Sequence, residues 1–485
     1  MPKIPSDTYE LVHKYADDLV IQRQNLEDAL RYQNAEVSEG EGMVTMINKV
    51  PSLTGAHASL PYISFARSSI NELPNINFNA IPAKDRGKIF RQAINIGYPN
   101  QLYINTINYY DVEDLEYAFG GPDGYPYGYI NLKLGPMFNL TNATTIRGLF
   151  YKNITGHQTV SVDLSEVPVV SAKKLKDLRN VRIPNLFLKL KDVKMEYMDE
   201  LFKLNIYNDS YINTAYTDES VEIALHVFKN FDFSELKEFK NFFCGKGPTA
   251  ECMDKFNIIM DAFLHINTHS VQKIEKLFAH NTSPAGGAFT EEQYYDLDFS
   301  TLDLNSVQTV NYLILVVPIK SVKTWDSPDG NLKDLSYCFD RNVAVYGSSQ
   351  EATDVKECRK YIKYIDLSTW NLCNVKNLYN MFSGNTLLEH LSFGYDLGKS
   401  YTYTSSNSSS YSVDLSFTNV LTRESVLDIF NKVYDLNISY GVYDEEGNPG
   451  TGTLATQKIN LHDDVIAKLT PEDIAIATNK GWNVS

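Results

Sequence analysis

The chain has 485 residues, of which 43% are apolar and 21% charged, a composition typical of folded proteins and a length that requires several domains or a repeat array. Its 44 basic and 60 acidic residues give a net charge of -16, which opposes binding to the phosphates of nucleic acids. No segment approaches the run of about 18 apolar residues that a membrane helix needs. We therefore expect neither a nucleic acid partner nor membrane insertion.

Residues 1–50 contain one helical pattern, between residues 9 and 32. Its stripe includes Val12, Leu19, Leu26 and Leu30, which indicates an amphipathic helix. The stripe fits either a helix packed on its own domain or a short coiled-coil seam, and we interpret it as a docking or oligomerisation segment of a homo-oligomer. Because the N-terminus lacks the apolar stretch of a secretory signal, we expect synthesis and retention in a cytoplasm, with free, buried thiols.

Residues 51–110 show no clear period and receive no fold assignment. From 111 to 398 an eleven-residue template recurs, with apolar residues at positions 1, 4, 7 and 8 and often Asn at position 11, as in Val375, Leu378, Met381, Phe382 and Asn385. Positions 1, 4, 7 and 8 share one face of a helix, so each copy predicts a short amphipathic helix that the Asn ends. The aromatic residues at position 8 are expected in the core: Phe119, Phe150, Phe202, Phe228, Phe263, Phe278, Phe339 and Phe382.

A second element is the triplet Asp-apolar-Ser, which lies mostly inside alternating stretches that indicate strands. It begins at Asp163, Asp232, Asp298, Asp366 and Asp414. Because it recurs with the repeat, we interpret its Asp and Ser as turn residues that bond backbone amides, not as catalytic or calcium-binding groups. Strand, turn and helix together span about 23 to 26 residues, within the leucine-rich-repeat range. Stacked units predict an α/β fold, an irregular leucine-rich-repeat-like solenoid.

The last part of the chain follows a run rich in Ser and Tyr at 399–412, which is either a flexible linker or an exposed contact loop. Residues 413–485 predict a small C-terminal α/β unit. It has a helix at 421–435, a strand at 453–461 and a helix at 470–480, which Thr470 caps and Pro471 begins.

One copy carries a family resemblance. The segment from Tyr364 to Phe382, which reads Tyr-Ile-Asp-Leu-Ser-Thr-Trp-Asn-Leu-Cys-Asn-Val-Lys-Asn-Leu-Tyr-Asn-Met-Phe, resembles the BspA-type leucine-rich repeats. Their consensus is Leu-Asp-Leu-Ser-x-Trp-Asp-x-Ser-x-Val-x-x-Met-x-x-Met-Phe. The resemblance is specific at 364–394, weaker from about 112 to 363, and absent before that. It implies either a surface adhesin or a tail protein of a phage that infects Gram-positive hosts.

Two further resemblances favour the phage tail. The segments from Leu421 to Phe430 and from Leu469 to Trp482 look like the closing unit of phage tail and baseplate proteins of this type. The segments from Asn25 to Leu30 and from Met46 to Val50 are similar to a short helical module at the start of phage tail components. We therefore expect a virion protein.

Motifs for chemistry are weak. His265 and His269 stand four apart, but no carboxylate partner accompanies them, and Gly245 to Thr249 lacks the spacing of a phosphate-binding loop. A turn after a helix ending at Phe243 explains the second motif. We find no nucleophile elbow and no distinct carboxylate pair, so we expect no enzyme, cofactor or metal.

These observations lead to one leading expectation and two alternatives. The leading one is a structural protein of a phage tail, baseplate or fibre that contacts other virion proteins, with a host cell-surface receptor as a further candidate partner. A bacterial surface adhesin or repeat scaffold is the second. A tail-borne cell-wall hydrolase is the third.

Overall fold

The computed structural model describes residues 64–66, 69–75, 77–121, 129–151, 160–181, 183–199, 216–246, 248, 250–282, 291–314, 319–340, 362–399, 412–437, 442–443, 449–450 and 457–485. The chain forms two compact units. Unit 1 runs to Leu175 and includes Val181–Leu190, and unit 2 consists of Lys176–Asn180 and Lys191–Ser485. The predicted N-terminal helix and the Ser/Tyr-rich run at 400–411 lie outside the described residues.

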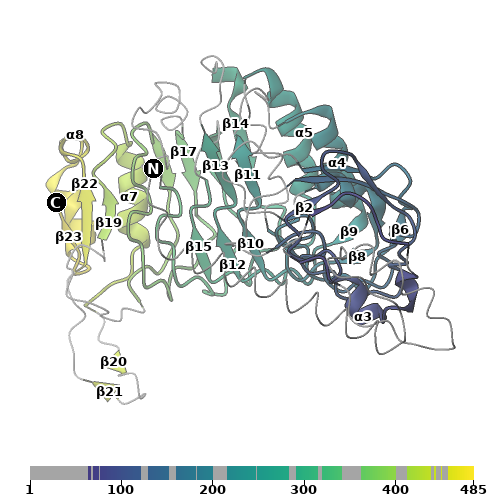
Figure 1. Ribbon diagram of the computed structural model, residues 1–485. Coiled ribbons are helices and arrows are strands. Elements are labelled where there is room, and N and C mark those ends of the chain that lie inside the picture. Colours follow the sequence, from purple (N-terminus) through teal and green to yellow (C-terminus); the bar gives the residue numbers. More distant parts are fainter. Residues whose placement is uncertain are drawn as a thin grey trace, which may run out of the picture. The chain divides into compact units, whose positions relative to one another are not determined.

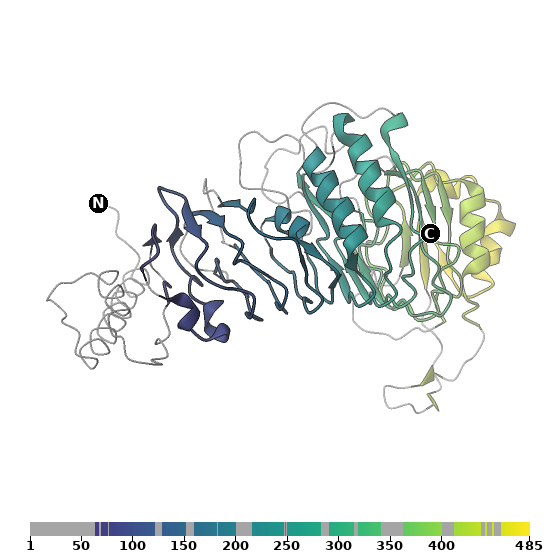
Figure 2. The same ribbon diagram turned by 90° about the vertical axis from the view of Figure 1, so that its right-hand side faces the viewer.

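Unit 1 is built on a ladder of parallel strands (Figure 2). β4 lies at its centre, with β5 on one side and both β2 and β3 on the other, and β1 pairs with β2. Part of this ladder comes from residues 51–110, for which the sequence predicted no fold. The elements of unit 1 are β1 (Ser69–Ile70), η2 (Phe78–Ala80), α3 (Ala83–Arg86), β2 (Asn95–Ile96), β3 (Leu102–Ile104), β4 (Ile130–Leu134), β5 (Val160–Asp163), β6 (Val170–Ser171) and η3 (Pro184–Lys189); β7 (Leu190–Lys191) straddles the division between the units.

Unit 2 contains several parallel ladders of its own (Figure 1). The longest runs through β10, β12 and β15 and continues in single bridges on both sides, from Asp177 and Tyr197 to Asp334 and Asn377. The other ladders are β14-β16-β17-β18, β11-β13 and β8-β9. The strands are β8 (Val193–Lys194), β9 (Phe231–Asp232), β10 (Glu238–Lys240), β11 (Phe243–Lys246), β12 (Lys273–Glu275), β13 (Phe278–Thr282), β14 (Tyr295–Asp298), β15 (Thr309–Asn311), β16 (Ile319–Lys323), β17 (Tyr364–Asp366) and β18 (His390–Ser392).

Two helices lie side by side in unit 2, α4 (Asp218–Asn230) and α5 (Met253–Phe263), as Figures 1 and 2 show. Thr217 and Ser220 form a capping box at the start of α4. The same unit contains the short helices η4 (Ala250–Cys252) and η5 (Glu291–Gln293). The thiols of Cys252 and Cys338 are free and buried, and that of Cys373 is free and partly exposed.

The C-terminal part of unit 2 has a three-stranded parallel sheet in the order β19-β22-β23. The predicted helix cap is confirmed, because the Thr470 side chain accepts a hydrogen bond from the backbone of Asp473 and Pro471 begins the helix. The elements are β19 (Ser412–Leu415), α7 (Arg423–Lys432), β22 (Lys458–Leu461), α8 (Asp463–Ile466), α9 (Pro471–Thr478) and β23 (Asn483–Val484), and β20 (Val442–Tyr443) pairs antiparallel with β21 (Pro449–Gly450).

Helix α7 takes the place of a further strand beside β18. The Ser425 hydroxyl accepts a hydrogen bond from the Leu391 amide, and the Asp428 carboxylate accepts one from the Phe393 amide. At the other end of α7, the Lys480 ammonium donates to the carbonyls of Phe430, Asn431 and Val433. This helix therefore satisfies an open sheet edge that would otherwise invite another chain.

The prediction that each template copy forms a helix is wrong for most copies. Among the copies that the described residues cover in full, only those ending at Phe228 and Phe263 lie in helices, α4 and α5. Elsewhere position 3 lies on a ladder and position 6 adopts a positive φ, which cannot continue a right-handed helix. The positive-φ residues are Tyr117, Gly148, Asn241, Lys276, Tyr337 and Asn380, and Tyr312 in a copy that begins at Val307. In a copy that begins at Ala172 the positive φ lies instead at position 9, Asn180.

The spacing of the apolar template positions therefore reflects a short strand followed by a bend at position 6, which we call the corner. Position 4 points inward between two outward ladder residues, and positions 7 and 8 return to the core after the bend, as in Ile146, Leu149 and Phe150, all fully buried. A polar residue at position 3 supports the bend, since the side chains of Asp114, Asp334 and Asn377 each accept a hydrogen bond from the amide two residues later. A spacing of three and four residues does not distinguish this corner from a helix.

The predicted turn role of the Asp in the Asp-apolar-Ser triplets is confirmed. In all five, the Asp carboxylate accepts a hydrogen bond from the Ser amide, at 2.8 to 3.1 Å. The bonds from Ser165 lower the pKa of Asp163. At Asp232 and Asp298 burial raises the pKa, but the bonds from Ser234 and Ser300 and the nearby lysines outweigh it, so the net shift is again downward.

Because the pKa values of these carboxyl groups are lowered in the folded protein, acid is expected to reduce its stability. Stability from these carboxylates is fully present above the unfolded pKa of about 3.9 and is lost as the pH falls through the lower folded pKa. We expect the urea midpoint of unfolding to drop below about pH 4, and to drop less in a D232N/D298N variant, whose amide oxygens still accept the Ser bonds but do not titrate. Equal drops in both proteins would show that these carboxylates do not contribute.

Candidate interaction surfaces

The structure places most of the predicted core aromatic residues inside the two units. Phe119, Phe150, Phe263, Phe278, Phe339 and Phe382 are buried. Phe228 is only half-buried and packs on Phe233 and Phe263. Phe202 lies outside the described residues, as do the docking-helix residues Val12, Leu19, Leu26 and Leu30.

Stacked phenylalanines join neighbouring coils. In unit 1 the rings of Phe65, Phe90, Phe119 and Phe150 follow one another at 5.6, 5.4 and 5.2 Å between centroids. In unit 2, Phe243 stacks on Phe278 at 5.1 Å. The position 8 side chains in these stacks are therefore internal, and candidate binding surfaces are found among the exposed residues.

The most exposed of the described aromatic side chains, Tyr98, lies in unit 1 beside its strand ladder. Ile96 pairs with Ile130 and Leu102 with Leu132, so the five residues from Gly97 to Gln101 form a loop that leaves the strand line. Tyr98 in this loop stacks on Tyr129 at 4.3 Å between ring centroids, yet remains 51% exposed. Tyr129 is fixed in turn by a hydrogen bond from its backbone amide to the Asn95 side chain.

A second exposed tyrosine lies farther along the same ladder. Tyr103 on β3 faces Lys133 on β4, and the Lys133 ammonium lies 5.4 Å from the Tyr103 ring centroid. Glu166 joins both, accepting the Tyr103 hydroxyl at 2.5 Å and the Lys133 ammonium at 2.6 Å. The hydrogen bond from Lys133, with that from Tyr103, lowers the pKa of Glu166, and the bond to Glu166 raises that of Lys133.

Between the two tyrosines lie Asn131 on β4 and its partner Ser161 on β5. Both side chains face outward, because the strands alternate with the buried residues Ile130 and Leu132. We call this surface the tyrosine face; it consists of Tyr98, Tyr129, Asn131, Ser161, Tyr103, Lys133 and Glu166.

The outward residues of the longest ladder in unit 2 are instead paired charges. Lys273 and Glu275 on β12 form an ion pair at 2.6 Å. On the neighbouring strand β10, Glu238 lies opposite Lys273 and Lys240 lies opposite Glu275. Arg179 holds Asp177 in two bonds and covers the Tyr197 ring at 4.7 Å. Farther along, Tyr312 stacks on Tyr337 at 4.9 Å. Because these groups satisfy one another, they indicate a solvated face.

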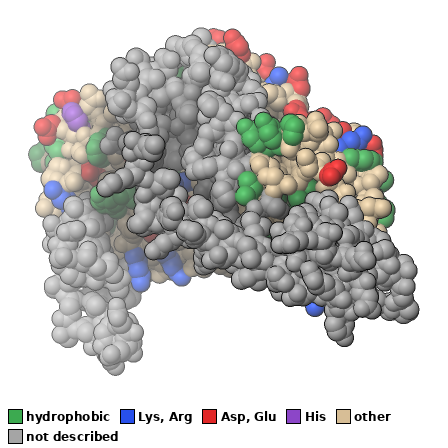
Figure 3. Space-filling model, in the orientation of Figure 1, with side chains coloured by type: hydrophobic (Ala, Val, Ile, Leu, Met, Phe, Trp, Pro, Cys, Tyr) green, Lys and Arg blue, Asp and Glu red, His purple; other side chains and the backbone are tan. Residues whose placement is uncertain are grey.

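Helices α4 and α5 form a different surface, with exposed Leu225 and Ile258. Figure 3 shows green hydrophobic side chains near these helices, with red and blue charged side chains between and beyond them. Isolated apolar residues among charges are normal on protein surfaces.

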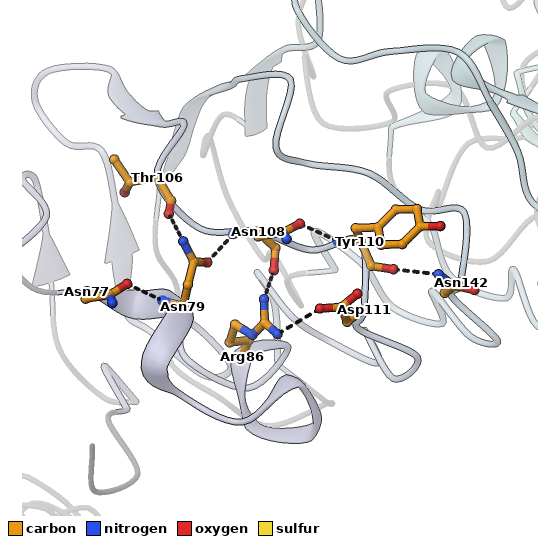
Figure 4. A network of polar contacts seen from close by, with 8 residues as sticks. All are labelled: Asn77, Asn79, Arg86, Thr106, Asn108, Tyr110, Asp111 and Asn142. Carbon is orange, nitrogen blue, oxygen red and sulfur yellow. Dashed lines mark hydrogen bonds and ion pairs between the residues drawn. The ribbon is translucent and has the colours of Figure 1, made fainter. Parts of the chain in front are cut away.

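An asparagine network in unit 1 connects neighbouring coils (Figure 4). The Asn79 amide donates to the Thr106 carbonyl and accepts from the Asn108 amide, and Asn142 donates to the Tyr110 carbonyl. Buried Arg86 donates to the Asn108 carbonyl and lies 3.5 Å from Asp111. These bonds join side chains to the backbone of neighbouring coils, so the role of the network is to hold the stack together. Asn385 does the same in unit 2, where it donates to the Phe339 carbonyl, which corrects its predicted role at a helix end.

The sequence motifs considered for chemistry form no site. The His265 Nδ1 donates a hydrogen bond to the Asp261 carbonyl, and His269 contacts Asn267. Gly245 and Lys246 belong to strand β11, which corrects the expected turn after a helix. Within the described residues no group of three or more His, Cys, Asp or Glu is placed to hold a metal ion, and no helix is long and apolar enough to cross a membrane.

Comparison with protein-family models, with curated proteins and with solved structures gives no match for this chain. The tyrosine face was not among the predicted sites. Its sequence signal was the Gly97-Tyr98-Pro99-Asn100 turn between two apolar pairs, which predicts a loop but not the strand that the loop leans on.

Proposed function

We propose that the chain is a structural protein of a phage tail, baseplate or fibre, and that its stacked coils form a leucine-rich-repeat-like solenoid that contacts other proteins or a host surface. The observation that carries this proposal is the ladder of consecutive parallel strands in each unit, with apolar residues inward and polar ones outward. Such a stack offers a long surface and a rigid frame, which suits contact better than chemistry.

The ends of the stack support the same role. Helix α7 and the β19-β22-β23 sheet close the ladder at β18, in the position where repeat proteins need a capping unit. The assignment to a phage particle rests on the resemblances of the segments at 364–394, 421–430 and 469–482. Docking through residues 1–50, as a homo-oligomer, completes the proposal.

Antibody labelling tests the proposal. Antibodies raised against the purified chain should decorate intact phage particles under the electron microscope, and the chain should co-purify with particles at a constant copy number. Labelling of the bacterial surface without labelling of particles would favour the adhesin. Release of soluble fragments from Gram-positive cell walls by the purified chain would favour the tail-borne hydrolase.

A further inference from the structure

We propose that the tyrosine face of unit 1 binds a short, neutral oligosaccharide, with Tyr98 and Tyr103 as stacking platforms. The inference rests on the proposed role of the stack as a contact surface, and it names the chemistry of one contact. It is carried by four properties of the face: its exposed rings, its unpaired polar groups, its charge balance and its rigidity.

The exposed rings point to a ligand with an apolar side. Tyr98 is 51% exposed and Tyr103 is 40% exposed, although each is anchored in the ladder. One face of the Tyr98 ring lies on Tyr129, so its opposite face is the exposed one. A pyranose ring presents a flat face of C–H groups that stacks on such a ring, while its hydroxyls stay at the edge for hydrogen bonds.

Polar groups for these hydroxyls lie between the two platforms. Tyr129 directly precedes β4, and Asn131 and Lys133 lie in it. Tyr129 and Lys133, which support the two platforms, are therefore about 13 Å apart at the usual rise of a strand. In the interval, the Asn131 amide and the Ser161 hydroxyl make no hydrogen bond to the described protein. An amide and a hydroxyl donate and accept, as sugar hydroxyls do.

The charge balance selects a neutral ligand. Lys133 and Glu166 are already paired at 2.6 Å, and Asp163, which faces Lys133 across the ladder, also interacts electrostatically with Lys189, so two lysines and two carboxylates balance here. An anionic polymer would have to displace Glu166 from Lys133 and approach Asp163. A neutral sugar can bond to the outer lone pairs of Glu166 without separating the pair.

The platforms are held in place before any ligand binds. Gly97 has a φ of +72°, and a Cβ there would lie 1.9 Å from the Asn131 carbonyl oxygen, so the loop rests directly on β4. Tyr103 is held by Glu166 and by Lys133. Binding to a preordered surface loses less conformational entropy, which favours affinity for a small ligand.

The full chain should be screened on an array of neutral hexose and N-acetylhexosamine oligosaccharides, with polyglycerol phosphate as the anionic comparator. The best oligosaccharide is then titrated by calorimetry. We expect Y98A and Y103A each to weaken its binding at least about tenfold. Y103F, which keeps the ring, should change binding less than about threefold, and Y110A, a 47% exposed tyrosine elsewhere in unit 1, should not change it.

Several outcomes would overturn the inference. These are a lack of binding to every neutral oligosaccharide, preference for polyglycerol phosphate, or binding that survives both Y98A and Y103A. Unchanged melting temperatures of the two variants separate loss of the site from loss of the fold. A chain that labels particles but binds no sugar would refute this inference alone, whereas a chain that binds sugar but is absent from particles would refute the proposed function alone.

Discussion

Replacing Phe119 with alanine is expected to lower the free energy of unfolding of unit 1 by about 3–5 kcal/mol. The side chain is fully buried and stacks on Phe90 at 5.4 Å and on Phe150 at 5.2 Å, so its removal leaves a cavity between coils. Neighbouring coils cannot close this cavity without breaking the strand ladder. Native-state hydrogen exchange of peptides that span residues 112–121 measures the loss within unit 1.

Y110A is the control for Phe119, because the Tyr110 ring is 47% exposed. It should change the same exchange free energies by no more than about 0.5 kcal/mol. The double variant F119A/F150A should cost less than the sum of the two single variants, since the rings lose one shared contact. Additive losses would mean that the stacked rings contribute separately and do not couple the coils.

The sequence predicted the inward residues better than the backbone that carries them. Ala143, Ile146, Leu149 and Phe150 are all buried, as their spacing indicated, but the chain between them is a bridge and a turn. Spacing records which side chains point inward. It does not record that Gly148 has a φ of +63°, and this one bend separates a corner from a helix.

Local side-chain chemistry was easier to predict than long-range contacts. The Asp-Ser turns and the Thr470 cap act within a few residues, so their chemistry is readable in a short segment. The tyrosine face joins Tyr98, Tyr129 and Glu166, which are brought together only by the ladder register. Strand β4 pairs with β3 and β2 at different offsets, Leu102 with Leu132 and Ile96 with Ile130, and this leaves no periodic signal in residues 51–110.

The largest backbone effect is expected at Gly97, which follows β2 and begins the loop of the tyrosine face. Its φ of +72° costs an alanine about 1–2 kcal/mol. A Cβ would also lie 1.9 Å from the Asn131 oxygen and 2.8 Å from the Leu102 nitrogen, both backbone atoms, and overpacking adds about 1–3 kcal/mol. We therefore expect G97A to destabilise unit 1 by about 2–5 kcal/mol, measured by hydrogen exchange in β4.

Gly481 offers a matched control, because its φ is +85° but the nearest atom to a Cβ is the Leu436 Cβ at 3.2 Å. G481A should therefore cost only the conformational part, about 1–2 kcal/mol. The same G97A variant should lose the stacking of Tyr98 on Tyr129, because the loop must lift from β4 to make room. If G97A costs no more than G481A, the loop yields without strain, and the close approach of Gly97 to Asn131 does not hold the tyrosine platform in place.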